Sequence, residues 1–404
     1  MFKLLDNAKK RKAYFMCCIC YISSGMMALV FGAILPQLIK EAGFSYTLAG
    51  GLVSYMALGQ VVGNLFLPEI IKKIGIKRAA MGFTLLIPVC LSIFTFLPPV
   101  AIMFMMVILL GCSRGTITIT TSLVSNAVSG NSSSCINFIN ACFALGAVLA
   151  PALISICSSL GFGWRIPVYI ISVFSFISAI LYRFIDFDYI NSLTEDKNNP
   201  VSENVIENQN NKSNKNFLFS SWYIFVILAN FFYVAIENSI NGWFTSYLKD
   251  TGIMSANMSR YMVSVTWGMI LIGRFSMAQV PESVPKKKLM LLDAVFGFVG
   301  LFIVLRASNI AIILPALMLT GFCMAGMYPT ALSYVGEKLQ ATNSNKARGI
   351  AWFCALSTLG GMIGPQLIGM AADFIGIKPA MGIMGLYGGL WLLFTILLYI
   401  KKNV

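Results

Sequence analysis

Long runs of apolar residues, separated by short polar segments, follow one another along almost the whole chain. An α-helix needs about 20 apolar residues to cross the hydrocarbon core of a bilayer, and most of the runs reach this length. The pattern therefore predicts an all-α membrane protein with 12 transmembrane helices. The predicted helices are 13–37, 47–67, 78–97, 100–129, 135–160, 166–184, 218–248, 259–279, 288–305, 309–335, 349–375 and 379–400.

One polar stretch, 185–217, interrupts this pattern. It carries six acidic residues between Asp186 and Glu207, and asparagine recurs from Asn198 to Asn216. A segment of this composition cannot bury enough apolar surface to fold by itself. We expect a flexible cytoplasmic linker at 185–217, between an N-terminal six-helix bundle (1–184) and a C-terminal six-helix bundle (218–404).

The two predicted bundles contain a repeated segment. Residues 145–155 read LGAVLAPALIS and residues 359–369 read LGGMIGPQLIG, with identical residues at five of eleven positions. Each segment lies in the fifth predicted helix of its half. A weaker echo pairs IGIKRAAMG (74–82) with IGIKPAMGI (375–383). Both observations favour a chain built from internal repeats, as many membrane transporters are.

The composition excludes several classes of protein. Hydrophobic residues make up 58% of the chain and charged residues 11%, with a mean hydropathy of +0.80. Soluble proteins are about 45–50% apolar and about 25% charged. A soluble enzyme, a disordered chain and a secreted disulfide scaffold are therefore excluded. The ten cysteines lie in or beside apolar runs and the chain has no histidine, so we expect no metal site and no cofactor.

The net charge of +14 is explained by where the basic residues lie. If the N-terminus is cytoplasmic, 22 of the 29 Lys and Arg residues fall on the cytoplasmic side and six on the outer side. This asymmetry is the positive-inside rule of membrane proteins. We therefore expect both termini in the cytoplasm, a location in the cell (inner) membrane, and no nucleic-acid partner. The amino-acid composition of the chain favours a bacterial source.

Two ionisable residues are predicted to lie well inside the membrane, Arg114 and Glu237. Each costs roughly 2.5–3.5 kcal/mol at the bilayer centre on insertion scales, so both should face a polar interior. Each also belongs to a stripe of polar residues with helical spacing. The stripes are Arg114, Thr118, Thr121 and Ser125 on the fourth predicted helix and Asn230, Tyr233, Glu237 and Asn241 on the seventh, with a shorter patch of Asn137 and Asn140 on the fifth.

These polar residues have two interpretations. Arg114 and Glu237 either bind substrate and couple transport to protons, or form a structural salt bridge between the halves. The asparagines either contact substrate or form hydrogen bonds between helices. Asp293 lies five residues after Lys288, and Asp373 lies near the outer end of its helix, so we expect structural roles for both.

Motifs of the chain resemble a known family. The segment G-x-x-x-x-P occurs at Gly146–Pro151 and Gly360–Pro365, and YVAIENSINGWFTSY spans 233–247. Thr266-Trp267-Gly268 followed by Gly273-Arg274, and Tyr328-Pro329-Thr330, complete the pattern. The chain resembles the major facilitator superfamily, and within it the fucose-permease-like sugar:proton symporters.

The resemblance implies two six-helix bundles around a central cavity and a sugar-like substrate. Aromatic residues at the matching positions could stack on a sugar or could anchor helices. The chain differs from the family at three points: Lys72 replaces an aspartate, the first predicted helix has no acidic residue, and the fourth carries Arg114 in place of a glutamate. The resemblance therefore extends to neither fucose itself nor the usual proton carrier. The candidate substrate-binding residues are Arg114, Thr118, Asn137, Asn140, Asn230, Tyr233, Glu237, Asn241, Trp243, Trp267, Tyr328 and Trp352.

These features favour a secondary active transporter that moves a small polar solute by alternating access, with protons as the coupling ion. The chain has no GxxxxGK[ST] segment, so ATP-driven transport is not expected. Efflux of drug-like compounds and uptake of an organic anion through Arg114 remain alternatives. A membrane enzyme and a sensor are disfavoured, since the usual hydrolytic constellations are missing. We expect a monomer in a lipid bilayer.

Overall fold

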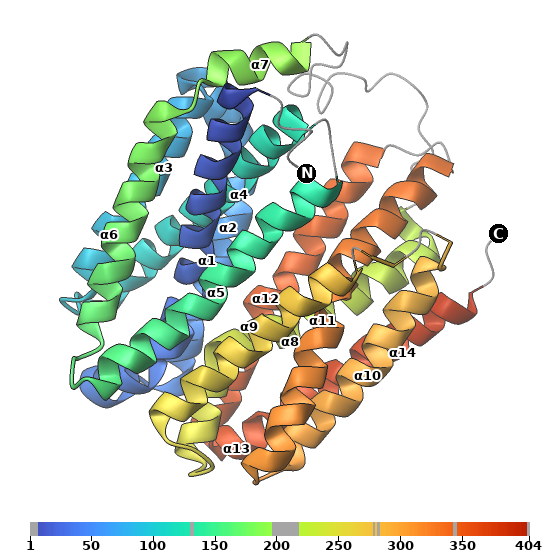
Figure 1. The fold of residues 1–404 in the computed structure, drawn as a ribbon. Helices are drawn as coiled ribbons and strands as arrows, with labels where there is room; N and C mark the ends of the chain where they lie inside the picture. Colours follow the sequence, from blue (N-terminus) through green and yellow to red (C-terminus); the bar gives the residue numbers. More distant parts are fainter. Residues whose placement is uncertain are drawn as a thin grey trace. The chain divides into compact units, whose positions relative to one another are not determined.

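The structure is a computed structural model that describes residues 7–129, 133–195, 218–277, 279–280, 283–341 and 346–401. Within these ranges the chain is almost entirely helical and contains no strand, which confirms the predicted all-α fold. Each predicted membrane helix corresponds to one observed helix, except that the last is divided into α13 and α14. The helices are α1 (Ala8–Ala42), α2 (Tyr46–Ile74), α3 (Ile76–Phe94), α4 (Val100–Ser129), α5 (Ser133–Ser159), α6 (Arg165–Leu181), α7 (Phe187–Glu195), α8 (Ser221–Asp250), α9 (Ala256–Met277), α10 (Lys286–Arg306), α11 (Ile310–Ala341), α12 (Lys346–Ile375), α13 (Ile377–Ala380) and α14 (Gly382–Ile400) (Figure 1).

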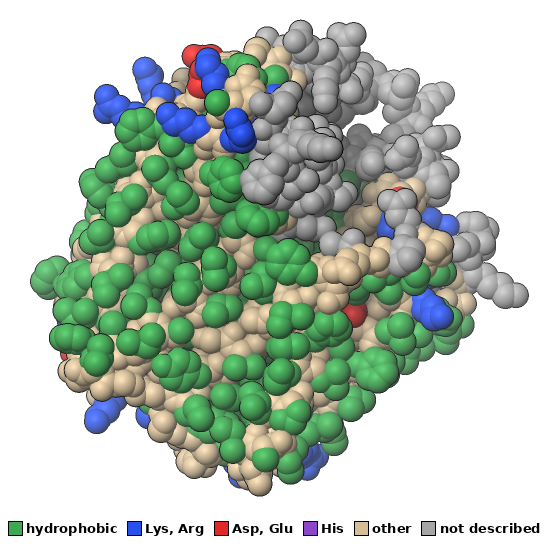
Figure 2. All heavy atoms as spheres, in the orientation of Figure 1, with side chains coloured by type: hydrophobic (Ala, Val, Ile, Leu, Met, Phe, Trp, Pro, Cys, Tyr) green, Lys and Arg blue, Asp and Glu red, His purple; other side chains and the backbone are tan. Residues whose placement is uncertain are grey.

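Eleven helical stretches in the described part of the chain are long and apolar enough to cross a membrane. The exception among the predicted membrane helices is α9, which has 22 residues. Arg260 and Arg274 lower its hydropathy. The protein is therefore a multi-pass membrane protein, and hydrophobic side chains cover most of the described surface seen in Figure 2.

The chain forms two compact units. Unit 1 comprises residues 1–43 and 55–204, and unit 2 comprises residues 44–54 and 205–404. The first turns of α2, expected in the N-terminal bundle, thus pack with unit 2. In the predicted linker, residues 187–195 form the short helix α7, and 196–217 lie outside the described residues.

Glycine allows α1 and α5 to pack closely in unit 1. A Cβ atom added to Gly146 of α5 would overlap the Ile22 carbonyl of α1, and one added to Gly25 of α1 would overlap the Phe143 carbonyl of α5. Helices in membranes associate through such small residues, because lipid is as apolar as a neighbouring helix.

The second copy of the repeated segment packs in the same way in unit 2. A Cβ on Gly360 of α12 would overlap the Phe231 carbonyl of α8. The first glycine of each repeated segment therefore sets the contact between the first and fifth membrane helices of its own unit. This shared contact gives a physical reason for the repeat.

Basic residues predicted to be cytoplasmic lie together at one end of each unit. In unit 1 the Lys9 ammonium is 2.9 Å from the carboxylate of Asp186, which directly precedes α7. This hydrogen bond, together with one from the Tyr189 amide, holds the pKa of the Asp186 carboxyl below its usual value. In unit 2, Lys286 pairs with Glu337.

Candidate functional site

The polar stripe on α8 is the main candidate site in unit 2. Asn230, Tyr233, Glu237 and Asn241 are spaced by three or four residues and share one face of the helix. Asn230 and Tyr233 are buried, and Glu237 is half-buried. The Tyr233 hydroxyl forms a hydrogen bond with Glu237. The structure therefore brings the predicted carboxylate together with a buried phenol one turn before it.

Asn230 is fully buried, and both polar atoms of its amide lack a hydrogen-bond partner among the described residues. Leaving a buried amide without hydrogen bonds costs about 1–3 kcal/mol, so such groups are normally satisfied by protein, water or ligand. Asn230 can therefore donate to and accept from a polar molecule that reaches this face of α8.

Trp267 of α9 adds an aromatic ring beside the stripe. Its indole Nε1–H donates to Asn241 Oδ1 at 2.8 Å, and its side chain is buried. Two residues chosen from the sequence for separate reasons are thus in direct contact. The hydrogen bond fixes the orientation of the Asn241 amide, and it leaves the Asn241 NH₂ group as a donor.

Tyr328 of α11 lies against α12. Its hydroxyl is 3.4 Å from Cys354 Sγ, and its ring centroid is 5.9 Å from that of Phe353. The side chain is half-buried. Tyr328 thus contacts two residues of α12.

The indole ring of Trp243 is enclosed by neighbouring helices and has no face exposed to solvent. Its side chain is fully buried, and its Nε1–H donates to the Pro365 carbonyl at 2.8 Å. Its ring fits against Gly50 and Gly369, where a Cβ would lie 2.9 Å from the indole. The structure therefore favours helix packing for Trp243, and it does not bring this residue to the α8 stripe.

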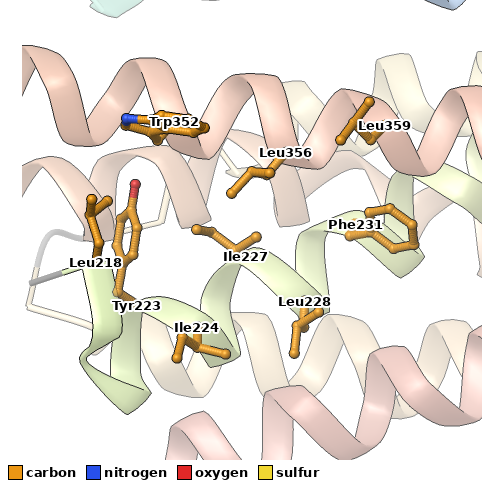
Figure 3. Close-up of a pocket in the computed structure, with 9 residues that line it drawn as sticks. All are labelled: Leu218, Tyr223, Ile224, Ile227, Leu228, Phe231, Trp352, Leu356 and Leu359. Atoms are coloured by element: carbon orange, nitrogen blue, oxygen red, sulfur yellow. The ribbon is translucent and has the colours of Figure 1, made fainter.

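Trp352 lies on a different surface. Its side chain is 45% exposed and lines an apolar groove of about 460 Å³ between α8 and α12. Figure 3 shows side chains of α12, among them Trp352, facing Ile227 and Phe231 of α8. All the side chains that line this groove are aliphatic or aromatic, so it offers little to a polyhydroxylated molecule.

In unit 1 the structure brings Arg114 of α4 together with α5. The Arg114 guanidinium lies over the Phe143 ring at 5.9 Å, a cation–π distance. Thr118, one turn after Arg114, is half-buried, and so is Asn140 of α5. Thr121 and Ser125, further along the α4 stripe, are almost fully buried. The side chain of Asn137 lies outside the described residues. The exposed part of the α4 stripe is therefore its Arg114 end.

Asp373 stabilises the N-terminus of α2. Its two carboxylate oxygens accept the backbone N–H groups of Tyr46 at 2.7 Å and Thr47 at 2.8 Å. The first N–H groups of a helix have no partner within the helix, and negative charge is favourable there. The Tyr46 hydroxyl also donates to Asp250 at 3.1 Å. This geometry fits the structural role expected for Asp373.

Asp293 is more buried than its position in the sequence suggests. The sequence places it near the membrane interface, but its side chain is buried in unit 2 and only 8% exposed. Its carboxylate is thus more deeply buried than that of the half-buried Glu237. Its position seven residues inside an apolar helix, with no basic residue one turn later, is the sequence signal that could have identified it.

Comparison of the sequence with known proteins finds one family model and several sugar transporters. A sequence model of the Major Facilitator Superfamily matches residues 17–343. The glucose/mannose transporter GlcP of Bacillus subtilis (strain 168) is 24% identical over 373 residues, covering 90% of this chain and 88% of GlcP. A glucose/galactose transporter of Brucella abortus is 27% identical over 152 residues, covering 37% of this chain and 36% of the relative.

Solved structures share the fold. The nucleoside transporter NupG superposes with a TM-score of 0.76 at 12% identity, covering 98% of this chain and 100% of NupG. The Major Facilitator Superfamily transporter FucP, in its outward conformation, gives a TM-score of 0.61 at 17% identity, covering 96% of this chain and 99% of FucP. At these identities the likeness concerns the fold.

Proposed function

The chain belongs to the Major Facilitator Superfamily, and we propose that it carries a neutral sugar across a bacterial cell membrane by alternating access, coupled to protons. The match to a glucose/mannose transporter over 90% of the chain is the observation that carries the choice of substrate. A repeat between the two halves, of the kind seen at Gly146 and Gly360, is typical of such transporters.

The chemistry of the α8 stripe supports a sugar. A neutral sugar presents many hydroxyl groups, each of which both donates and accepts hydrogen bonds, and pockets recognise such ligands with a few well-placed polar groups. Asn230 offers both kinds of atom without a partner among the described residues, and Asn241 offers its NH₂ group. Trp267 adds a ring beside them.

Glu237 and Arg114 are the proposed coupling residues. Burial favours the neutral form of a carboxyl group, whereas a nearby arginine favours the charged form. A change in the surroundings of Glu237 during the cycle would therefore change its proton occupancy. Proton binding is then linked to transport if the conformational states differ in their affinity for the proton.

Sugar binding and transport test this function directly. Glucose, mannose or galactose is expected to raise the melting temperature of the purified protein, because a ligand that binds only the folded state adds about 2.7 kcal/mol at 100 times Kd. The same sugars should enter proteoliposomes containing the protein, while L-glucose should neither stabilise it nor be transported.

Two other outcomes would replace the proposal. A melting shift with lipophilic cations alone would support drug efflux. A shift with organic anions that disappears in Arg114→Ala would support anion uptake. Asn230→Ala is expected to weaken the glucose shift at least about tenfold in ligand concentration, because each lost hydrogen bond in a buried site costs about 1–2 kcal/mol.

The proposed orientation places α7 and both termini in the cytoplasm. A cysteine at Ser192 of α7 is therefore expected to be protected from a membrane-impermeant maleimide in intact cells, while a cysteine at Lys378 is expected to react. Both positions are exposed in the structure. The natural cysteines are buried, apart from the half-buried Cys354, so their background labelling should be low. Labelling at Ser192 from outside would reverse the orientation.

A further inference from the structure

Asp293 is held inside unit 2 in unusual surroundings for a carboxylate. It lies seven residues after Lys286 at the start of α10, or about 10 Å along the helix at 1.5 Å per residue. Its Oδ2 atom is buried and has no hydrogen-bond partner among the described residues. The side chain thus sits at depth in a helix that is apolar enough to span a membrane.

The neighbouring helices surround this oxygen mainly with apolar and weakly polar groups. On α11, Gly326 packs so closely that a Cβ there would lie 2.5 Å from Asp293 Oδ2, and Met277 of α9 packs against the same glycine. The Cys323 thiol of α11 and the Tyr233 phenol of α8 lie near enough to interact electrostatically with Asp293.

Two further charged groups in this region, Glu237 of α8 and Arg274 of α9, interact electrostatically with Tyr233. On α14, the helix that also packs against α10, Trp391 packs over Gly297 and does not titrate. Its indole N–H also lacks a partner among the described residues. In the described part of unit 2, no ion pair is found for Asp293.

An isolated carboxylate anion in such surroundings costs several kcal/mol, which a bound cation removes. A metal ion would need several oxygen ligands. The described residues contain no group of three or more acidic, cysteine or histidine side chains placed to hold a metal ion, and Gly326 and the Met277 side chain pack beside Oδ2. The cation that fits is a proton.

Tyr233 connects this carboxylate to the proposed coupling residue. Its hydroxyl is hydrogen-bonded to Glu237, and its phenol also lies close enough to Asp293 for a weaker electrostatic interaction. A change of charge at either carboxylate therefore changes the electrostatic potential at the same buried phenol, which lies on the polar stripe of α8.

We propose that Asp293 is a second proton-binding carboxylate of the transport cycle, linked to Glu237 through Tyr233. In one conformation Oδ2 takes a proton from the aqueous phase and forms a neutral carboxylic acid. In the other conformation the O–H bond breaks and the proton returns to water on the opposite side. The proposal rests on proton-coupled transport, and it deepens that function by giving it a second proton site.

The steady-state accumulation of glucose in proteoliposomes measures this proton count. With a pH difference of one unit, each coupled proton multiplies the limiting accumulation ratio about tenfold, because 1.4 kcal/mol is a factor of ten. Asp293→Asn is therefore expected to lower accumulation about tenfold and to reduce sugar-driven proton uptake per sugar. Glucose counterflow, which needs no gradient, should remain. Asp188→Asn on the exposed surface of α7 is the control and should match the wild type in all three assays.

The outcomes separate the two hypotheses. If the wild type moves no sugar, the proposed function fails. If the wild type accumulates sugar under a pH gradient and Asp293→Asn does so equally, only the role of Asp293 is wrong. If a sodium gradient drives accumulation in place of the pH gradient, the bound cation is not a proton.

A measurement on the wild type avoids dependence on how well the variant folds. Dicyclohexylcarbodiimide reacts with protonated carboxyl groups in apolar surroundings by adding the carboxyl oxygen and proton across its C=N bond. Mass spectrometry is expected to find this adduct on Asp293, with a yield that falls as pH rises. Absence of the adduct across the pH range in which transport occurs would overturn the proposal.

Discussion

Replacing Gly146 or Gly360 with leucine is expected to prevent the protein from folding into a stable, monodisperse species in detergent. A Cβ at either position would overlap a backbone carbonyl, that of Ile22 or Phe231. A backbone atom cannot move aside as a side chain tip can, so the two helices must separate. Overpacking of a core typically costs about 1–3 kcal/mol and sometimes more, and total stability is only about 5–15 kcal/mol. Size-exclusion chromatography and a melting curve would measure the loss.

The chain provides matched controls for this change. Gly389 of α14 and Gly268 of α9 are also helical, but a Cβ at either meets no atom within 4 Å. Leucine at these positions should leave the elution profile and the melting temperature near those of the wild type. Equal behaviour of Gly146→Leu and Gly389→Leu would show that the close approach of α1 and α5 is not needed for the fold.

The helical fold could be predicted from the sequence because the bilayer restricts the choices. Backbone N–H and C=O groups must be satisfied within the membrane, so a run of about 20 apolar residues has to be helical. The repeat at 145–155 and 359–369, which contains Gly146 and Gly360, could also be recognised in the sequence. The sequence could not name their partners, Ile22 and Phe231, because no local pattern reports which distant helix lies opposite.

The candidate site could be predicted only in part, because the sequence does not show which helices pack against one another. An apolar face packed against protein looks the same in sequence as one that faces lipid. This is why Trp243 and Trp352 could not be told apart from Trp267: one is enclosed by glycines, one lines an apolar groove, and one contacts Asn241. The stripe of Asn230 to Asn241 could be predicted, since its spacing depends only on helical geometry.

The two acidic residues Asp293 and Asp373 show the same difference between what depends on one helix and what depends on its neighbours. Counting from Lys288 places Asp293 close to the start of its helix, and in the structure it lies seven residues after Lys286, the first residue of α10. Burial depends on Gly326 and Met277, which belong to other helices, and so could not be read from the count. The expected role of Asp373 fits the structure because it depends on proximity to a helix end.

Glu237→Gln is expected to abolish proton-driven accumulation of sugar while leaving counterflow measurable. Glutamine keeps the size and the hydrogen-bonding atoms of glutamate, so Tyr233 can retain a partner. It cannot gain or lose a proton in the working pH range. Because the proton on Asp293 is proposed to act through Tyr233 and Glu237, removal of the Glu237 charge should uncouple both sites, a larger effect than the tenfold loss expected for Asp293→Asn.

Arg114→Ala is expected to impair counterflow as well as accumulation, because it removes the one charged group of the α4 stripe together with its contact over Phe143. Arg114→Lys keeps the charge but loses the planar guanidinium, so it separates the two contributions. Uptake of labelled sugar into proteoliposomes, with and without a pH gradient, distinguishes the variants.

If Glu237→Gln accumulates sugar at the wild-type rate under the gradient, coupling does not pass through this carboxylate. Glu237 would then be a structural residue of α8, or transport would be driven by sodium or left uncoupled.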